Sequence, residues 1–398
     1  MSADTFTRWA IVASGEGGGR IASQFFSRTE NPGIENRILV MNTNRNDLRN
    51  TIDRMEQRLA ADDDLWDSHA LEFGSEQGAG NFFPDGEACA REDFGKIVGR
   101  MARVFDIADA FMHVMTLGGG TGNGSIPYVV DQFSGGIDAA DAATEPWMDS
   151  VIHSAFAVWP YENEPPQRHF NAVCGLSRLL RTAEGSQNAD MVLLASNSHL
   201  AEDDAGRDYD GINEAILEAI DLLIGAGRRT HGVIDIKDYV TLPSQLDAYH
   251  FTPAVATGLN SDVFELEYMF ERAAENAYVP MDPATTRAAY AIVRAPEHLI
   301  ESERLTEPAV YSAFDGWMSE TGINAPSQVS LTPTEGRGSE VDVMLLLGGF
   351  DLRPLLATSR DEFDLLAEGL AGGDDGLTQR EIDRIESNLD EYVERSEG

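Results

Sequence analysis

One stretch of the sequence decides the fold: Gly118-Gly119-Gly120-Thr121-Gly122-Asn123-Gly124-Ser125. An apolar run at 111–117, expected to be a strand, precedes it, and an apolar run from Ile126, expected to start a helix, follows it. Glycines let the backbone turn tightly and direct several N–H groups at one point, and the helix N-terminus adds the positive end of its dipole. We therefore predict a cradle for a polyphosphate, with a plain tight turn as the alternative. The cradle is not a lysine-bearing P-loop, because the chain has no Gly-Lys-Ser or Gly-Lys-Thr string.

The sequence on either side of this stretch predicts an α/β fold. Short apolar runs typical of buried strands alternate with segments whose apolar residues have helical spacing. This alternation favours a parallel sheet with helices on both faces, which binds ligands at the C-terminal ends of its strands. The other strands expected in the first half are 9–13, 37–41, 151–159 and 191–196, with a helix over 20–26.

The second half of the chain begins with its clearest helix, over 209–225, where isoleucine and leucine repeat with the helical period. Strand-like runs follow at 289–293 and 341–347. The last forty or so residues are acidic, and 378–393 has the spacing of a solvated helix. We interpret this tail as a solubilising acidic extension.

Composition restricts the class of protein. The 398 residues include 68 acidic and 29 basic side chains, which gives a formal net charge of −39. Binding to nucleic acid through a basic face, or attraction to anionic lipid, is therefore excluded. Lys96 and Lys237 are the two lysines, and every other basic residue is arginine. Many carboxylates with few lysines are typical of proteins that work in molar salt, so we expect a halophile; a mesophilic protein with an acidic function is the alternative.

Several other kinds of site and segment are not expected. Cys89 and Cys174 make neither a disulfide framework nor a CxxC pair, and the histidines show no metal-binding pattern, so no metal site of the protein's own is predicted. His113 lies inside an apolar strand and is expected in the core. The longest apolar runs are far shorter than the roughly 20 residues that cross a bilayer. We expect a cytoplasmic protein, with the cell cortex as an additional location, and no direct membrane insertion.

The stretch at 118–125 resembles the signature loop of the tubulin/FtsZ superfamily of GTPases, and the resemblance covers most of the chain. Further segments similar to the family's nucleotide loops are 15–21, 42–44, 78–81, 160–168 and 209–213. Besides the eight residues quoted above, the resemblance implies nucleotide binding by Gly15, Glu16, Gly17, Gly18, Arg20, Asn42, Gly80, Asn81, Glu164, Arg168, Asn197, Tyr209 and Asn213.

The resemblance also implies roles within the nucleotide site. The 15–21 loop contacts phosphates and base, the 78–81 loop senses the γ-phosphate, and Glu164 holds the ribose while Arg168 reaches the phosphates. Tyr209 and Asn213 are four residues apart, share a helix face, and suit stacking on a purine and reading its edge. A half-buried core tyrosine is the alternative for Tyr209, and a surface ion pair the alternative for Arg168.

A second diagnostic segment is 232–239, GVIDIKDY. It resembles the family's catalytic loop, which enters the nucleotide pocket of the next subunit and positions the attacking water with its carboxylates. Asp235 and Asp238 match the two acids and are the predicted catalytic residues, although Asp238 could also cap a helix. Val233 stands where the family has an asparagine, and Lys237 lies between the acids. The replacement of the asparagine by Val233 predicts slow hydrolysis.

The predicted organisation is a Rossmann-like parallel-sheet GTP-binding domain, 1–205, a central helix, 206–228, a smaller α/β domain, 229–358, and an acidic tail, 359–398. The predicted function is a GTP-binding cytoskeletal protein that polymerises head to tail and hydrolyses GTP at the subunit interface. Mg²⁺ is expected with GTP or GDP. The predicted partners are further copies of the chain and an anchor or adaptor protein, and the expected roles are cell shape, motility or division.

Two alternative functions remain open. A nucleotide-binding regulator of the same superfamily, without hydrolysis or polymerisation, is favoured by Val233. A dinucleotide-dependent oxidoreductase built on the first glycine loop would need an acidic residue after the second strand, where Asn42-Thr43-Asn44 stands instead. The tail lacks the short, proline-containing apolar peptide of division FtsZ proteins, so the chain is more similar to CetZ-type or other non-standard members.

Overall fold

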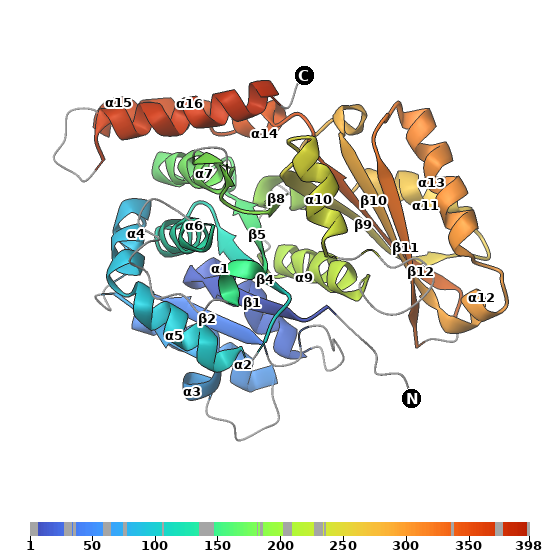
Figure 1. Ribbon diagram of the computed structural model, residues 1–398, viewed down its shortest axis with the longest axis horizontal. Coiled ribbons are helices and arrows are strands. Elements are labelled where there is room, and N and C mark those ends of the chain that lie inside the picture. Colours follow the sequence, from blue (N-terminus) through green and yellow to red (C-terminus); the bar gives the residue numbers. More distant parts are fainter. Residues whose placement is uncertain are drawn as a thin grey trace.

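The computed structural model describes residues 7–27, 34, 37–58, 65–74, 78–105, 107–134, 147–180, 182–183, 186–201, 209–226, 234, 236–335, 338–370 and 377–395. Ten strands form one sheet in the order β11-β10-β12-β9-β8-β5-β4-β1-β2-β3 (Figure 1). Their bounds are β1 Trp9–Ser14, β2 Ile38–Asn42, β3 Ala70–Glu72, β4 Ala110–Thr116, β5 Ile152–Trp159, β8 Met191–Ser196, β9 His250–Asn260, β10 Ala288–Pro296, β11 Ser327–Thr334 and β12 Glu340–Gly348. The short strands β6 Thr182–Ala183 and β7 Ser186–Gln187 pair separately.

Helices cover both faces of this sheet. In the first half they are α1 Gly15–Gln24, α2 Arg45–Arg58, α3 Leu65–His69, α4 Phe83–Glu92, α5 Phe94–Val104, α6 Thr121–Phe133, α7 Pro166–Leu180, α8 Asn197–Leu200 and α9 Tyr209–Gly225. In the second half they are α10 Asp238–Gln245, α11 Leu266–Ala274, α12 Glu297–Glu301, α13 Glu307–Thr321, α14 Arg353–Ala357, α15 Arg360–Leu370 and α16 Gln379–Arg395. Short 3₁₀ turns occupy Phe25–Ser27, Met148–Ser150 and Pro283–Thr285.

The first half of the sheet is parallel, as the sequence predicts. Neighbouring strands from β3 through β2, β1, β4, β5 and β8 to β9 all pair in parallel. Every residue of β1 and β8 is buried, because helices pack on both faces and leave no solvent side for polar residues. The strands expected at 9–13, 37–41, 111–117, 151–159 and 191–196 are confirmed to within a residue or two.

The second half continues the same sheet. β12 pairs antiparallel with both β9 and β10, and β10 pairs in parallel with the edge strand β11. The two halves join through a short ladder in which Val192 and Leu193 of β8 face His250 and Phe251 of β9. The division into domains at 205, 228 and 358 stays a prediction, since the ladder makes one continuous sheet from both parts.

Three hydrophobic clusters hold these layers together. One lies beneath α4, α5, α6 and α7, and a second lies on the opposite face beneath α1, α2, α9 and α10. The third lies between the β9–β12 part of the sheet and helices α11 and α13. The helix predicted over 209–225 is confirmed as α9, and Arg294 of β10 ties it to the second half through ion pairs with Glu218 at 2.6 Å and Asp221 at 2.7 Å.

Two long strands escaped the sequence analysis. β9 contains Pro253 and Gly258, and its second half is partly exposed, so it shows no continuous apolar run. β11 is an edge strand in which buried Val329 and Leu331 alternate with polar residues. Each strand is too mixed in composition for its period to stand out.

The first helix begins earlier than expected. α1 starts at Gly15 instead of residue 20, so the first glycine cluster is the first turn of the helix. These glycines are required because the helix lies directly on β4. A Cβ at Gly18 would lie 2.4 Å from the Val114 carbonyl oxygen, and one at Gly17 would lie 2.3 Å from the Thr116 side chain.

The expectation of a solvated tail helix is wrong. α16 matches the helix predicted over 378–393, but it lies along α7 together with α15 (Figure 1). Ile382, Leu389 and Tyr392 are almost fully buried, and the Tyr392 hydroxyl contacts Nδ1 of His250 at 2.7 Å. The described parts of the tail, 359–370 and 377–395, are therefore packed parts of the fold with an acidic outer face, and not an extension.

His113 is a core residue, as predicted. It is fully buried on β4, and its Nε2 lies 3.1 Å from Nδ1 of His153 on β5. Burial lowers the pKa of His153 to about 4, so the pair is neutral near pH 7. Among the described residues no helix combines the length and the hydropathy needed to cross a bilayer.

Candidate functional site

A cavity of about 520 Å³ opens at the C-terminal ends of the parallel strands. It lies where loops follow β1, β2, β4 and β5, and the start of α9 completes its wall. Most of the residues implicated by sequence line it: Gly15, Glu16, Gly17, Arg20, Asn42, Gly80, Asn81, Gly118, Gly119, Gly120, Thr121, Gly122, Glu164, Arg168, Asn197, Tyr209 and Asn213. Segments far apart in the sequence thus converge on one concave surface.

Two glycines of the 118–122 loop, Gly120 and Gly122, have no room for a side chain. A Cβ at Gly120 would lie 2.7 Å from the Phe82 nitrogen and 2.9 Å from the Ala79 carbonyl oxygen. A Cβ at Gly122 would lie 2.7 Å from the Ser14 carbonyl oxygen. α6 begins at Thr121, so its first N–H groups and positive dipole end lie at the cavity. This is the geometry of an anion cradle.

Four of the predicted nucleotide-binding residues do not line the cavity. Gly18 and Gly124 are packing positions, since a Cβ at Gly124 would lie 2.3 Å from the Phe83 carbonyl oxygen. Asn123 is fully buried and donates to the carbonyl oxygens of Leu117 at 2.7 Å and Asn171 at 2.5 Å. The Ser125 hydroxyl is 2.7 Å from that of Ser14. These residues hold the cradle in place from behind.

A second group of side chains lies around Glu164. This carboxylate is almost completely buried, and its Oε1 accepts a hydrogen bond of 3.2 Å from the Tyr209 hydroxyl. The other oxygen, Oε2, pairs with Arg168 at 3.1 Å. The Tyr209 ring packs edge-on against Tyr161, with centroids 5.5 Å apart. Tyr209 and Arg168 therefore line the cavity. They also make internal contacts of the kind expected under the alternative interpretations, a half-buried core tyrosine and an ion-paired arginine.

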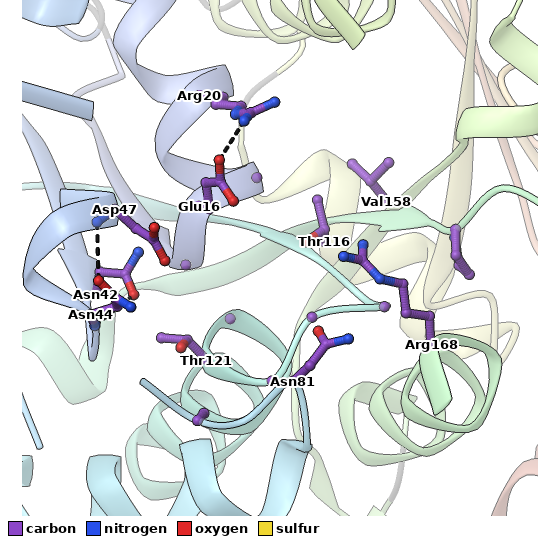
Figure 2. A pocket seen from close by; sticks show the side chains of 18 of the residues that line it. Glu16, Arg20, Asn42, Asn44, Asp47, Asn81, Thr116, Thr121, Val158 and Arg168 are labelled. Atoms are coloured by element: carbon purple, nitrogen blue, oxygen red, sulfur yellow. Dashed lines mark hydrogen bonds and ion pairs between the residues drawn. The ribbon is translucent and has the colours of Figure 1, made fainter. Parts of the chain in front are cut away.

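The side of the cavity nearest α1 and α2 is acidic. Figure 2 shows Glu16 joined to Arg20 on α1, with Asp47 on the same side and Arg168 on the opposite side. Burial, and secondarily the nearby Glu16 carboxylate, raise the pKa of Asp47, while Arg20 partly offsets them. Within the described ranges, no group of three or more His, Cys, Asp or Glu side chains could hold a metal ion alone. Glu16 and Asp47 do suit Mg²⁺ that arrives with a phosphate chain, because Mg²⁺ uses few carboxylates and completes its shell with phosphates and water.

Eight lining residues were not among the predicted binding residues. Ile21, Asn44, Gly78, Ala79 and Pro160 lie inside segments that resemble the nucleotide loops, whereas Asp47, Thr116 and Val158 lie outside them. Asp47 carried a usable signal, because it lies in the first turn of the helix that follows the second loop. Thr116 and Val158 carried none, since they are the last and the second-last residue of buried strands.

The second diagnostic segment lies away from this cavity. Asp238 begins α10, its backbone carbonyl accepts a hydrogen bond of 2.8 Å from the Tyr290 hydroxyl, and it does not line the cavity of its own chain. The preceding residue, Lys237, is the N-cap and makes no side-chain cap. Val233 and Asp235 lie outside the described residues.

The chain resembles known proteins in both sequence and structure. No protein-family model matches the sequence. The chain is similar to the tubulin-like protein CetZ2 of Haloferax volcanii, with 28% identity over 228 residues, 56% of this chain and 55% of that protein. It thus spans about half the length of the curated relative that it matches. The origin of this relative agrees with the halophilic composition.

Solved structures match over nearly the whole chain. A GTPγS-bound protofilament of CetZ2 from Haloferax volcanii gives a TM-score of 0.70 at 21% identity, covering 90% of this chain and 99% of that one. CetZ from Methanosaeta thermophila gives 0.72 at 16% identity, covering 98% and 97%. An empty FtsZ dimer of M. jannaschii gives 0.62 at 19% identity, covering 86% and 88%. The chain is therefore similar in sequence to CetZ2 over about half its length, and it has the fold of these solved CetZ and FtsZ structures.

Proposed function

We propose that the chain binds GTP and GDP in this cavity, polymerises head to tail, and hydrolyses GTP where two copies meet. The observation that carries the proposal is a glycine cradle in the same cavity as a buried Glu164 carboxylate that contacts Tyr209 and Arg168. The solved CetZ2 of Haloferax volcanii is a GTPγS-bound protofilament, which supports the same ligand class and assembly here.

Each group in the cavity has a role that follows from its chemistry. The N–H groups at the start of α6 would bind the phosphates, and Arg168 would neutralise part of their charge. Glu164, held by Tyr209, would accept hydrogen bonds from ribose hydroxyls. The Tyr209 ring would stack on the base, and the amide of Asn213 would read its edge. Mg²⁺, when bound with the triphosphate near Glu16 and Asp47, would offset the negative charge of the phosphates.

Hydrolysis requires a positioned water molecule. Asp238 starts α10 outside the cavity of its own chain, so its carboxylate would serve a neighbouring copy. Asp235 would act beside it, and the two carboxylates would orient the water that attacks the γ-phosphate. A contact between two different surfaces of the same chain propagates into a filament. Hydrolysis would then depend on assembly.

Phosphate release from GTP in molar KCl, measured across a range of protein concentrations, tests this proposal. Wild type should show turnover that rises cooperatively above a threshold concentration. Asp235→Ala and Asp238→Ala should lower turnover at least about tenfold while still binding GTP. Glu320→Ala, which removes an exposed acid from α13, is the matched control and should behave as wild type.

The same measurement decides between this proposal and a nucleotide-binding regulator, which Val233 favours. Slow turnover that is flat in concentration and unchanged by Asp235→Ala would support the regulator. The wider proposals are a role in cell shape, motility or division, a cytoplasmic location that includes the cell cortex, and an adaptor or anchor protein as a partner.

A further inference from the structure

Asn171 of α7 bridges two loops of the cavity from behind. Its side chain is fully buried and does not line the cavity. The Nδ2 group donates to the carbonyl oxygen of Asn81 at 2.9 Å and to that of Gly118 at 3.0 Å. A primary amide has two N–H donors, so one side chain uses both of them to join two loops.

The remaining polar atoms of Asn171 also hold the walls of the cavity. Its Oδ1 accepts from the Phe83 nitrogen at 3.4 Å, at the start of α4. Its backbone carbonyl accepts from Nδ2 of Asn123, which lies in the first turns of α6. The loop 78–81, the loop 118–122 and the starts of two helices thus share one buried residue.

These two loops need such an anchor. Gly78, Gly80 and Asn81 all have positive φ, at 88°, 51° and 60°, a conformation that local sequence alone holds weakly. The loops also touch closely, since a Cβ at Gly120 would lie 3.0 Å from the Asn81 carbonyl carbon. A small change in their spacing would therefore alter the whole phosphate-binding surface.

The electrostatics favour the same conclusion. The carbonyl oxygens of Asn81 and Gly118 carry partial negative charge and lie beside a cavity suited to an anion. Hydrogen bonds to the buried amide hold both oxygens toward α7 and away from a bound phosphate. Without the amide, either peptide could turn its carbonyl into the cavity and repel the ligand.

We propose that Asn171 is a positioning residue that sets the spacing and orientation of the 78–81 and 118–122 loops for the polyphosphate of the nucleotide. The inference rests on the proposed function, because it concerns how that site binds phosphate. It predicts that Asn171 determines the affinity gained with each added phosphate, and not the affinity for the nucleoside part.

A series of guanine nucleotides with one, two and three phosphates tests this proposal. Equilibrium dialysis in molar KCl with GMP, GDP and GTPγS gives three dissociation constants for each variant. Asn171→Ala should weaken GTPγS about tenfold or more, the size expected for losing one or two buried hydrogen bonds, and GMP by less than about threefold. Asn171→Asp has nearly the same shape and keeps the acceptor for the Phe83 N–H, yet should show the same selective loss because a carboxyl group has at most one donor for the two carbonyl oxygens.

Asn188→Ala is the matched control. Asn188 is also buried and donates from Nδ2, at 2.5 Å, but to the Arg178 carbonyl at the far end of α7. It should lower stability without changing the ratio of the GMP and GTPγS affinities. Thermal unfolding of each variant reports the stability change separately.

The outcomes are distinguishable. If wild type binds none of the three nucleotides, the proposed function fails. If wild type binds them but the Asn171 variants lose all three affinities equally, or lose none, Asn171 is not a positioning residue and the inference is overturned. If Asn171→Ala does not fold, the near-isosteric Asn171→Asp decides by the same ratio.

Discussion

Asp47 places a second carboxylate, besides Glu16, on the α1–α2 side of a cavity whose glycine loops suit an anion. Glu16 lies on the same side, and the two carboxylates are close enough for Glu16 to contribute to the raised pKa of Asp47. Two negative charges beside a triphosphate are unfavourable unless a cation lies between them. Arg20 pairs with Glu16, so one net negative charge remains on this side of the cavity. At the scale of single residues, we therefore expect the proposed nucleotide binding to depend on a divalent cation.

Asp47→Asn should have opposite effects with and without Mg²⁺. In EDTA the substitution removes a repulsive charge and should raise GTP affinity about two- to fivefold, whereas in Mg²⁺ it removes a favourable group and should lower affinity by a similar factor. Competition binding in both buffers measures this. Asp53→Asn, an exposed acid on the same helix, should change neither value. A change of the same sign in both buffers would contradict a cation role.

The same residue predicts how the effect of Mg²⁺ on nucleotide affinity in wild type depends on pH. Burial and Glu16 raise the pKa of Asp47, so its charge is lost at a less acidic pH than that of an ordinary aspartate. The difference between affinities in Mg²⁺ and EDTA should therefore begin to shrink as the pH falls toward that raised pKa. It should be fully present near neutral pH.

Single residues also show what sequence could and could not reveal about the site. The loops were identifiable because glycine clusters at strand ends have a recognisable composition, and most of their residues line the cavity. Within the same motif, Asn123 and Ser125 face inward and support the loop. The composition of the motif does not show which of its residues line the cavity and which support it from behind. Asn171 lies mid-helix among apolar residues, so nothing in its neighbourhood marks its contacts with two distant loops.

At the scale of elements, α16 shows how an acidic sequence concealed a buried face. Its exposed positions carry many acids, yet Ile382, Leu389 and Val393 lie on one side and pack in the same cluster as α7. Sequence predicted the helix correctly from this spacing but not its surroundings. The Ser177 hydroxyl of α7 also donates to the Ile385 carbonyl at 2.6 Å, so the two helices are joined by polar contacts as well.

Substitutions of two leucines in the tail test whether α16 packs against α7 in solution or is surrounded by solvent. Leu389→Ala should lower the free energy of unfolding by about 2–4 kcal/mol, because the side chain is 4% exposed and its removal leaves a cavity against α7. Leu365→Ala on α15 is the matched control, since Leu365 is 63% exposed and should cost less than about 0.5 kcal/mol. Chemical denaturation in constant molar KCl measures both. Equal small effects would mean that α16 is not docked in solution.

At the scale of the whole molecule, the charge exceeds what ion pairing can balance. With 68 acidic and 29 basic residues, most carboxylates have no cationic partner available. Many ion pairs of the described residues also join side chains that are close in the sequence, such as Glu16 with Arg20 and Glu87 with Arg91, each on a single helix. Exposed pairs of this kind contribute little to stability. The folded state therefore carries a large uncompensated repulsion that only dissolved ions can screen.

Stability should therefore depend strongly on salt. The Debye length is about 3 Å at 1 M salt and about 10 Å at 0.1 M, so lowering KCl exposes each carboxylate to the field of many others. We expect the thermal unfolding midpoint to fall steadily as KCl is reduced from about 2 M to 0.1 M, and GTP affinity to fall with it, because a triphosphate is repelled by the same field. Differential scanning fluorimetry and dialysis across a KCl series measure the two effects. Sucrose at matched osmolality separates screening from general exclusion of solute: if sucrose restores stability as fully as KCl, charge repulsion is not the cause, and the acidic surface would need another explanation.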